Sequence, residues 1–251
     1  MSGSPVAGEF ALGTRNMNRS ISRFSVSGRD RTGDMTLRPA GHGPAMLTVM
    51  PSFGLDLADW FTKHADDVES HLKRYFGGGK DKFTGRWFDE FAAIGDPNRF
   101  EASDVLAVEA LSVEVPPEAA STLLINESER FNSLLRQIPR DQDLWEVSRL
   151  TVNVGGPADD LHNALRTLPR VDWVTAGKLM AAKRPRLIPI LDNKVKDFIR
   201  PPDGLFWLKL HDELADESRR AAITNACQAA PPQISLLRRI DVALWMAATQ
   251  T

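Results

Sequence analysis

The sequence is poor in cysteine, with Cys227 as its single thiol. One thiol excludes an intramolecular disulfide, and it excludes any zinc or iron–sulfur site that needs several thiolates. No apolar run approaches the roughly 18 residues that a membrane-spanning helix needs, and the N-terminus lacks the charged-then-apolar pattern of a secretion signal. We therefore expect a cytoplasmic protein with no membrane partner, and nothing in the sequence indicates a cofactor or a metal.

Strand-like alternation is also scarce, whereas apolar residues recur at spacings of three and four. The chain has 251 residues and 42% hydrophobic content, which is enough to build a core. We therefore predict a mainly α fold. The expected helical segments are 53–76, a short aromatic element at 83–91, 104–113, 118–137, 144–152, 159–168, 173–183, 192–200, 205–214, 219–229 and 234–246.

Residues 1–45 show no such periodicity and are rich in Gly, Ser, Arg and Pro. This composition is typical of a segment that does not bury a core of its own. We interpret residues 1–45 as a disordered tail or a non-native extension, with Met46 and Met50 both acceptable as native starts. The folded domain is then expected at 46–251.

Charge of one sign is not in excess, because the net charge is only −2. This value excludes a protein that coats DNA through overall basicity. The charge is uneven, however, since residues 170–200 hold eight Lys and Arg against three Asp. Such a local surplus indicates either a phosphate-facing patch or a solvated helix face.

The segment 168–200 carries the most specific pattern in the chain. It begins with a tight turn, Leu168 to Asp172, which opens into an apolar-periodic helix at 173–183. An extended run then ends on Asp192 at the start of a further helix. The pattern predicts a hairpin between two helices, followed about twenty residues later by a carboxylate at a helix start.

This segment resembles the helix-hairpin-helix DNA glycosylases, and most closely their adenine-mismatch branch, whose patterns are L-P-G-V-G-x-x-T-A-G and P-I-L-D-x-x-V-K. The resemblance covers 33 of the 251 residues. It implies two small helical lobes with a cleft, duplex DNA as the partner, and hydrolysis of the N-glycosidic bond of a damaged, modified or mismatched base. The iron–sulfur cluster that many members of that branch carry is excluded by the single thiol. The matching residues are Leu168, Pro169, Val171, Thr175, Ala176, Gly177, Pro189, Ile190, Leu191, Asp192, Val195 and Lys196.

The resemblance places the hairpin against a DNA phosphate, which glycines allow the backbone N–H groups to approach closely. Both glycine positions differ in this chain, being Arg170 and Asp172. Arg170 offers a charged contact instead, and Asp172 is expected to cap the next helix by accepting from the N–H of Val174 or Thr175. The residues assigned to DNA binding are Arg170, Val171, Trp173, Thr175, Lys178, Lys183, Arg184, Arg186, Lys194 and Lys196.

Asp192 is the candidate catalytic carboxylate. Cleavage of an N-glycosidic bond builds positive charge on the sugar, and a nearby ionised carboxylate stabilises that charge while it positions or deprotonates water. A helix start favours the ionised form, and the resemblance puts the catalytic Asp at this place. The alternative is a helix cap without chemistry, because Asp is a favoured N-cap residue.

The resemblance also calls for an acid that protonates the leaving base, and Glu109 in the apolar segment 104–113 is the candidate, with Glu114 as substitute. Burial would raise the pKa of Glu109 as a general acid requires, whereas an exposed Glu109 would pair with an Arg. Val174 stands where some members of the superfamily carry a lysine nucleophile, so the resemblance implies a monofunctional enzyme that uses water. The candidate wall residues of a base pocket are Trp145, Trp173 and Trp207. Each of them either stacks on the base or packs in the core, and the sequence leaves both roles open.

The whole chain further resembles a group of uncharacterised bacterial proteins that share DVLAVEALSV, W-V-T-A-x-K-L and K-R-P-R-L-I-P, here at 104–113, 173–179 and 183–189. No activity is assigned to that group. Three functions therefore stay open: a glycosylase, a catalytically inactive DNA- or protein-binding module on the same fold with 183–189 as contact surface, and an enzyme on free nucleosides or nucleotides. A glycosylase needs Asp192 at an open cleft with a second acid across it, whereas a binding module would tie Asp192 to Lys or Arg.

Overall fold

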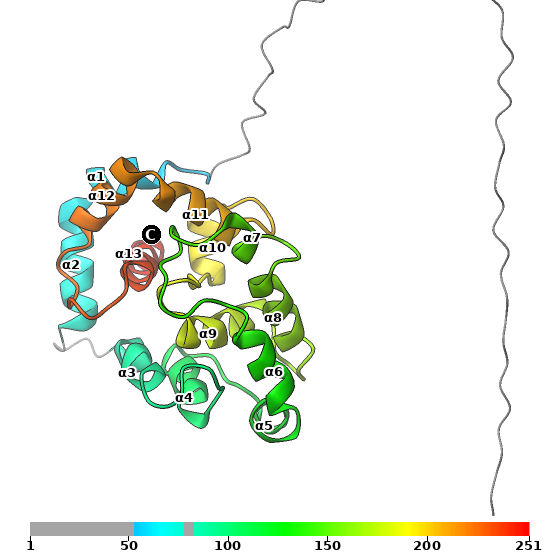
Figure 1. Ribbon diagram of the computed structural model, residues 1–251. Coiled ribbons are helices and arrows are strands. Elements are labelled where there is room, and N and C mark those ends of the chain that lie inside the picture. The colour runs from blue at the N-terminus through cyan, green and yellow to red at the C-terminus, as the bar shows by residue number, and fades with distance from the viewer. Residues whose placement is uncertain (1–52, 78–82, 251) are drawn as a thin grey trace, which may run out of the picture. The chain divides into compact units, whose positions relative to one another are not determined.

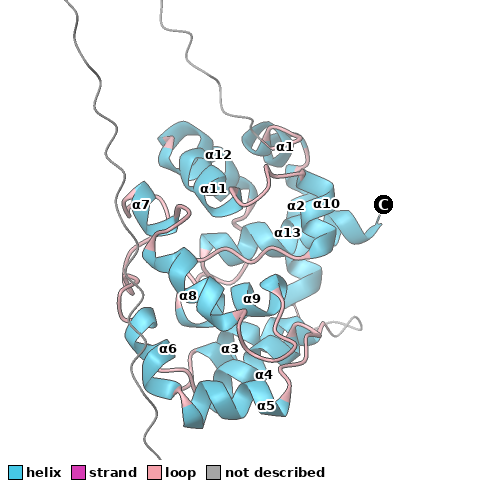
Figure 2. Ribbon diagram, turned by 90° about the vertical axis from the view of Figure 1, so that its right-hand side faces the viewer, coloured by secondary structure: helices cyan, strands magenta, loops and turns pink. Residues whose placement is uncertain are grey.

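Every regular element in the described part of the chain is a helix, and the computed structural model describes residues 53–77 and 83–250. Figure 2 shows helices and loops there and no strand. The mainly α prediction is confirmed, while the interpretation of residues 1–45 and of the two possible starts lies outside the described residues. The elements are, in chain order, α1 (Leu57–Lys63), α2 (Ala65–Phe76), the 3-10 helix η1 (Thr84–Trp87), α3 (Phe88–Ala92), α4 (Ala102–Ala110), α5 (Pro117–Ser121), the π-helix η2 (Thr122–Asn126), α6 (Ser128–Leu135), α7 (Arg149–Val152), α8 (Pro157–Leu165), α9 (Trp173–Lys183), α10 (Asn193–Ile199), α11 (Phe206–Ala215), α12 (Glu217–Ala226) and α13 (Leu236–Gln250).

The single helix predicted at 118–137 is interrupted by η2. There the N–H of Glu127 donates to the carbonyl oxygen of Thr122, five residues earlier, at 2.9 Å. The hydroxyls of Ser121 and Thr122 both donate to the carbonyl oxygen of Glu118 at 2.9 Å. Such side-chain bonds compete with the regular helical pattern and bend a helix, which accounts for the break between α5 and α6.

Only the end of the helix predicted at 144–152 forms, as α7. The N–H of Leu144 donates to the carbonyl oxygen of Arg186 at 3.0 Å, so the preceding segment makes a long-range backbone contact instead of a helical one. Ser148 then starts α7, because its hydroxyl accepts from the N–H of Leu150 at 3.3 Å.

The last helix, α13, packs between α2 and α10 (Figure 1). Leu237, Ile240 and Leu244 recur at helical spacing and are each no more than 3% exposed. Burial of one such side chain stabilises the fold by about 1.5–3 kcal/mol. Val242 and Met246 are buried as well, so neighbours enclose α13 on more than one face and fix the side chains that it carries.

The turn at 166–172 joins α8 to α9, where the sequence predicts the hairpin. Asp172 caps α9 as expected, because its Oδ1 accepts from the N–H of Thr175 at 2.8 Å. Arg170 has φ +58°, a left-handed conformation that favours glycine. Arg170 stands where the resembled pattern has its first glycine. The turn therefore keeps a backbone conformation that favours glycine, although the residue is an arginine. The division into two lobes and the glycosylase-like fold stay predictions.

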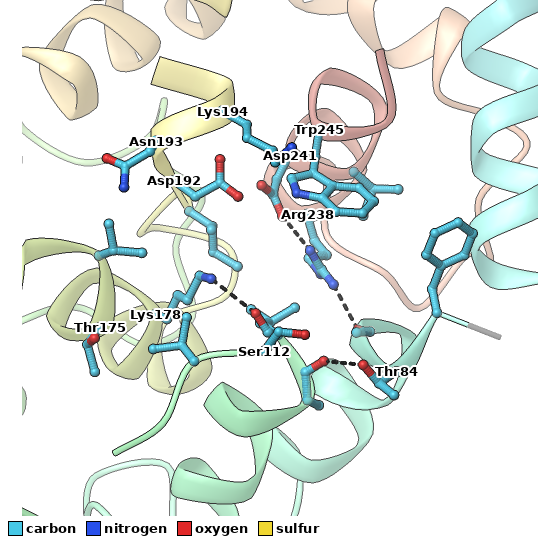
Figure 3. Close-up of a pocket in the computed structure, with 18 of the residues that line it drawn as sticks. Thr84, Ser112, Thr175, Lys178, Asp192, Asn193, Lys194, Arg238, Asp241 and Trp245 are labelled. Atoms are coloured by element: carbon cyan, nitrogen blue, oxygen red, sulfur yellow. Dashed lines mark hydrogen bonds and ion pairs between the residues drawn. The ribbon is translucent and has the colours of Figure 1, made fainter. Parts of the chain in front are cut away.

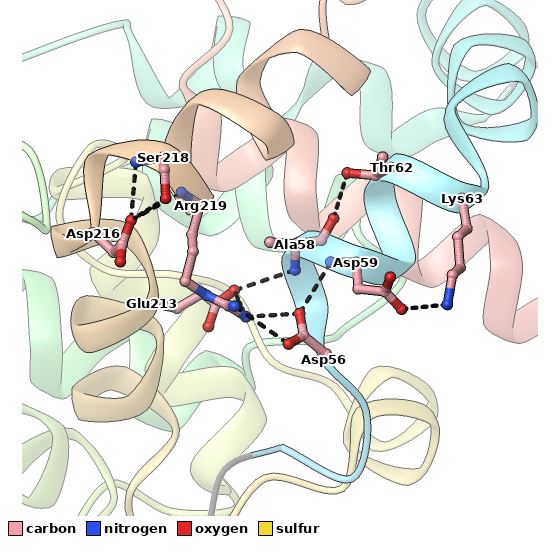
Figure 4. Close-up of polar contacts among 9 residues, drawn as sticks. All are labelled: Asp56, Ala58, Asp59, Thr62, Lys63, Glu213, Asp216, Ser218 and Arg219. Carbon is pink, nitrogen blue, oxygen red and sulfur yellow. Dashed lines mark hydrogen bonds and ion pairs between the residues drawn. The ribbon is translucent and has the colours of Figure 1, made fainter.

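A polar network ties the start of α1 to α12 (Figure 4). The predicted helix 53–76 forms as α1 and α2, and Arg219 of α12 contacts Asp56, which caps α1, at 2.7 Å. The same guanidinium contacts Glu213 at 2.7 Å, and Glu213 accepts from the N–H of Ala58 at 3.2 Å. The hydrogen bond from Arg219 holds the pKa of Asp56 below its ordinary value.

Candidate active site

A cleft of about 480 Å³ opens between the end of α4 and the helices α9, α10 and α13 (Figure 3). Its size lies in the range of small-molecule sites. Figure 3 shows the carboxyl groups of Asp192 and Asp241 turned toward each other across it. The charged lining residues are Asp172, Lys178, Asp192, Lys194, Arg238 and Asp241, and the aromatic ones are Tyr75, Phe83 and Trp245.

Asp192 lines the cleft from the first turn of α10. Its Oδ1 accepts from the N–H of Val195 at 2.9 Å, so it caps the helix as its sequence position predicts. Among the contacts of the described residues, its second oxygen has no hydrogen-bond or ion-pair partner. The cap therefore fixes the side chain through one oxygen and leaves the other for a ligand.

Asp241 of α13 is the second carboxyl group of the cleft, and its side chain is only 6% exposed. Burial raises the pKa of Asp241 to about 6, against the opposing attraction of Arg238. The negative charge of Asp192 raises it further. This carboxyl group therefore holds a proton at a higher pH than an ordinary Asp does.

Arg238 fixes Asp241 in place, one turn earlier on α13. Its guanidinium pairs with Asp241 and donates to the hydroxyl of Tyr75 and the carbonyl oxygen of Gly85, both at 2.8 Å. It also reaches Asp89 at 3.4 Å. Gly85 has to be glycine here, because a Cβ would lie 2.1 Å from the Tyr75 hydroxyl. The cluster joins α13 to α2, η1 and α3 around the cleft.

Lys178 reaches the cleft from α9 and is 5% exposed. Its Nζ donates to the carbonyl oxygen of Leu111 at 3.4 Å, a long contact that leaves most of its donor capacity unused. Burial lowers the pKa of Lys178, and the charges of Asp241 and Asp192 oppose that shift. A buried ammonium beside two carboxyl groups therefore presents N–H donors to whatever enters.

Three aromatic rings form one wall of the cleft. The rings of Tyr75 and Phe83 stack with centroids 5.1 Å apart, and Trp245 meets Phe83 edge-on at 6.0 Å. The sequence prediction named Trp145, Trp173 and Trp207 for such a wall. Those three tryptophans lie outside the cleft lining, so that prediction is wrong for this site.

Glu109 and Glu114 do not reach the cleft. Both side chains are exposed, and neither is among the lining residues, although their neighbours Ala110 to Val113 are. Of the two alternatives left open for Glu109, burial is therefore excluded, and the side chain is exposed. The end of α4 turns its acidic side chain toward solvent and its backbone and small side chains toward the cleft.

Lys183 and Arg184 are buried at 3% and 1% exposure and cannot contact a phosphate. Lys183 pairs with Asp104 at 2.7 Å. Arg184 donates to four backbone carbonyl groups, among them those of Ile138 and Leu135 at 2.9 and 2.8 Å. Their assignment to DNA binding is corrected accordingly: both cations stabilise the packing of α9 against the preceding helices.

The hairpin presents less to DNA than the sequence predicts. The N–H of Val171 donates to the carbonyl oxygen of Leu168 at 3.2 Å, and Val171 is buried. Thr175 is buried too, with its hydroxyl donating to Asp172 at 2.7 Å. Arg170 is exposed and pairs with Glu118 at 2.9 Å. Direct contacts by Val171 and the Thr175 hydroxyl would require these bonds to break.

The remaining predicted contacts divide among three places. Lys194 is exposed at the rim of the cleft, which is consistent with a phosphate contact there. Arg186 makes a two-point contact with Asp143 at 2.8 and 2.6 Å. Trp173 and Lys196 line a separate pocket on another face of α9.

Sequence reasoning missed Asp241 and Arg238, although a signal for them exists. The predicted helix 234–246 is strongly apolar, and within it Arg238 and Asp241 stand three residues apart, on the same face. Charged residues are seldom fully buried unless they are paired. An opposite pair at this spacing in an apolar helix is thus a pattern typical of a buried polar site.

A family model described as a family of unknown function (DUF6308) matches residues 68–248, more than half of the chain. The chain belongs to the DUF6308 family. The expected kinship with a family of unknown function is confirmed, and the DUF6308 match contains every residue that lines the cleft. No curated protein and no solved structure matches the chain.

The described part of this DUF6308 chain lacks two other kinds of feature. Within residues 53–77 and 83–250, no group of three or more His, Cys, Asp or Glu side chains is arranged to hold a metal ion. None of the helices described has both the length and the apolar character needed to cross a membrane.

Proposed function

We propose that the cleft hydrolyses the N-glycosidic bond of a damaged, modified or mismatched base in DNA, with water as the nucleophile. The observation that supports this most directly is the pair of carboxyl groups, Asp192 and Asp241, which line one cleft, face each other there and have different environments. Glycoside hydrolysis needs one ionised carboxylate and one protonated carboxyl group, and different surroundings separate these two roles.

Asp192 acts in this proposal through its unpaired oxygen. As the bond from C1′ to the base nitrogen breaks, its electron pair leaves with the base and positive charge grows on the sugar. The carboxylate stabilises that charge and orients a water molecule toward C1′. The water oxygen forms the new bond to C1′, and its proton passes to Asp192.

Asp241 supplies the proton that the departing base takes up, the role that the sequence analysis gave to Glu109. Its raised pKa, about 6, suits a general acid near neutral pH. Arg238 binds one carboxyl oxygen of Asp241, and the Asp241 side chain also lines the cleft. Lys178 donates to acceptor atoms of the bound base, and the aromatic wall stacks on its face.

A second candidate is a catalytically inactive DNA- or protein-binding module on the same fold. The observation that favours it is the hairpin, where the Val171 N–H is already bonded and Arg170 is paired with Glu118. The unbonded oxygen of Asp192 and the open cleft favour the enzyme, because a pure binding module has no use for a carboxylate oxygen that no N–H group or cation binds directly.

The test is base release from duplexes that carry adenine opposite oxidised guanine, uracil or alkylated purines, with free nucleosides in parallel. Asp192→Asn keeps the helix cap, since Asn caps as well as Asp does, and should lower the rate at least about 100-fold. Asp241→Asn should do the same. Asp197→Asn, on the exposed face of α10 and outside the cleft, is the matched control and should keep wild-type activity.

Abasic-site formation by the wild type, lost in the two cleft variants, would support the proposal. Release from free nucleosides alone would move the substrate class to small molecules. No release by any protein, with salt-sensitive DNA binding retained in all of them, would instead favour the binding module.

A further inference from the structure

A second pocket, of about 320 Å³, lies on another face of α9 from the cleft. Trp173 and Gly177, four residues apart on α9, line this pocket, whereas Thr175 and Lys178 line the cleft. Trp207 of α11 contributes a second indole ring. The two sites therefore share the helices α9 and α10 but none of these side chains.

His162 contacts both tryptophans, the backbone of Trp173 and the ring of Trp207. Its Nε2 lies 3.0 Å from the carbonyl oxygen of Trp173, and its ring meets the Trp207 ring edge-on, with centroids 5.3 Å apart. A carbonyl oxygen can only accept, so Nε2 carries the proton in this contact. Burial lowers the pKa of His162, which leaves Nδ1 of the neutral ring as an acceptor.

Gly177 forms the open floor of the pocket. A Cβ built at this position would meet no atom within 4 Å, so no packing contact requires the glycine. A glycine inside a helix weakens it relative to alanine. Gly177 thus leaves space that no neighbour fills, at the expense of helix stability, in a pocket that two tryptophans also line. This arrangement is expected for a ligand site.

Charged side chains of both signs border the same pocket, since Asp159 and Asp203 line it together with Lys196 and Arg166. The Nζ of Lys196 lies 5.6 Å from the centre of the Trp173 ring and 3.5 Å from Asp203, which is almost fully exposed. Arg166 also lines the pocket and is exposed. A flat ring between indoles with an anionic group near these cations is the chemistry of a nucleotide.

We propose that this pocket binds one nucleotide, with the base stacked on Trp173 and Trp207 above Gly177 and the phosphate toward Lys196 and Arg166. This site goes beyond the proposed hydrolysis, because it takes an intact nucleotide and requires no group of the cleft. The nucleotide comes either from solution or from a strand that runs past α9.

The test uses adenosine monophosphate and a short single-stranded oligonucleotide as probes, with ribose 5-phosphate and a base-free oligonucleotide of equal charge as ring-free controls. The wild type should bind the base-containing probe at least about tenfold more tightly than its control, as expected for one lost stacking contact. Gly177→Leu fills the floor with a good helix former and should remove that preference. Trp207→Leu should do likewise.

Trp87→Leu is the matched control, since Trp87 is exposed and lies outside this pocket. It should bind as the wild type does, and so should the cleft variant Asp192→Asn. Binding of the mononucleotide supports a site for free nucleotides, and binding of the oligonucleotide alone supports one for a strand. Equal affinity for ring-bearing and ring-free probes would overturn the proposal, and so would wild-type binding by Gly177→Leu or a ring preference lost in Asp192→Asn.

Discussion

Lys178, Lys183 and Arg184 lie on α9 or directly after it, and all three are almost fully buried. Their surroundings differ: Lys183 has a carboxylate, Arg184 has backbone carbonyl oxygens, and Lys178 has one long contact and an open cleft. Removing a cation from water is costly unless partners replace the water. The incompletely satisfied Lys178 is therefore the one of the three that is placed to bind a ligand.

The buried pair of Lys183 and Asp104 leads to a prediction about stability. Lys183→Met should destabilise the protein by about 3–5 kcal/mol, because it leaves a buried carboxyl group without its cation. Burial already raises the pKa of Asp104 to about 6, and loss of Lys183 should raise it further. Urea unfolding measures the free energy of unfolding.

The double change Asp104→Leu with Lys183→Met should cost less than Lys183→Met alone, since no unpaired charge remains buried. Lys63→Met removes a pair with Asp59 that is exposed on both sides, and it should leave the unfolding midpoint nearly unchanged. Equal losses in the buried and the exposed variants would contradict the account of Lys183.

Asp241 leads to a prediction about pH. A general acid acts only while it is protonated, and the protonated fraction falls as the pH rises through the pKa. Because burial raises the pKa of Asp241 to about 6, kcat/KM for base release should fall above that pH. Single-turnover rates from about pH 5 to about pH 8 would trace this limb, and a rate that rises over the same range would rule out the assignment.

At the scale of the helices, start signals were readable and interruptions were not. Asp172 and Asp192 begin α9 and α10 as their positions predict, because a carboxylate that accepts from the third following N–H is a local device. The break at η2 depends on which hydroxyl bonds back to Glu118, and no Gly or Pro marks it in the sequence. The helix caps were therefore predictable from single residues, whereas the competition between side-chain and backbone hydrogen bonds at η2 was not.

The docking of α1 on α12 can be tested through Arg219. The pKa of Asp56 in the folded protein lies below its ordinary value of 3.8. The stability that this carboxylate contributes is therefore fully present above the ordinary pKa, and it is lost as the pH falls through the lower pKa of the folded state. Arg219→Met should flatten this acid dependence and speed hydrogen exchange at the amide of Ala58.

Arg149→Met serves as the control for that experiment, since Arg149 forms an exposed pair with Asp212 away from α1. It should leave both the acid dependence and the Ala58 exchange rate as they are in the wild type. Unchanged exchange in Arg219→Met would mean that apolar packing alone holds α1.

At the scale of the whole molecule, the sequence pattern located one side of the cleft. Asp192 and Lys178 were named from the segment 168–200, because their neighbours form a recognisable local pattern. Asp241 lies almost fifty residues further on, and only the packing of α13 against α10 brings it opposite Asp192. Contacts between residues so far apart in the sequence produce no local spacing pattern, so the pairing of Asp192 with Asp241 could not be predicted from the sequence.

The same packing predicts a weak dependence of DNA binding on salt. Each phosphate contact adds about −0.9 to the slope of log K against log salt. All eight cations of residues 170–200 would give about −7, whereas the three that are neither buried nor paired with a carboxylate from a distant part of the chain give about −3. Fluorescence anisotropy from about 50 to 200 mM salt measures the slope, and a value near −7 would contradict the burial and pairing described. The cations expected to contribute are Lys194 and Arg200, which are exposed, and Lys196, which is half-buried and pairs with the nearby, almost fully exposed Asp203.

The contacts of Arg238 have a consequence for the order in which the chain is made. Tyr75, Gly85 and Asp89 leave the ribosome well before α13, which carries both Arg238 and Asp241. Until α13 docks, a nascent chain has neither the guanidinium that joins these elements nor the proposed acid. A partly synthesised chain that already contains Asp192 therefore lacks the partner carboxyl group on which the proposed function depends.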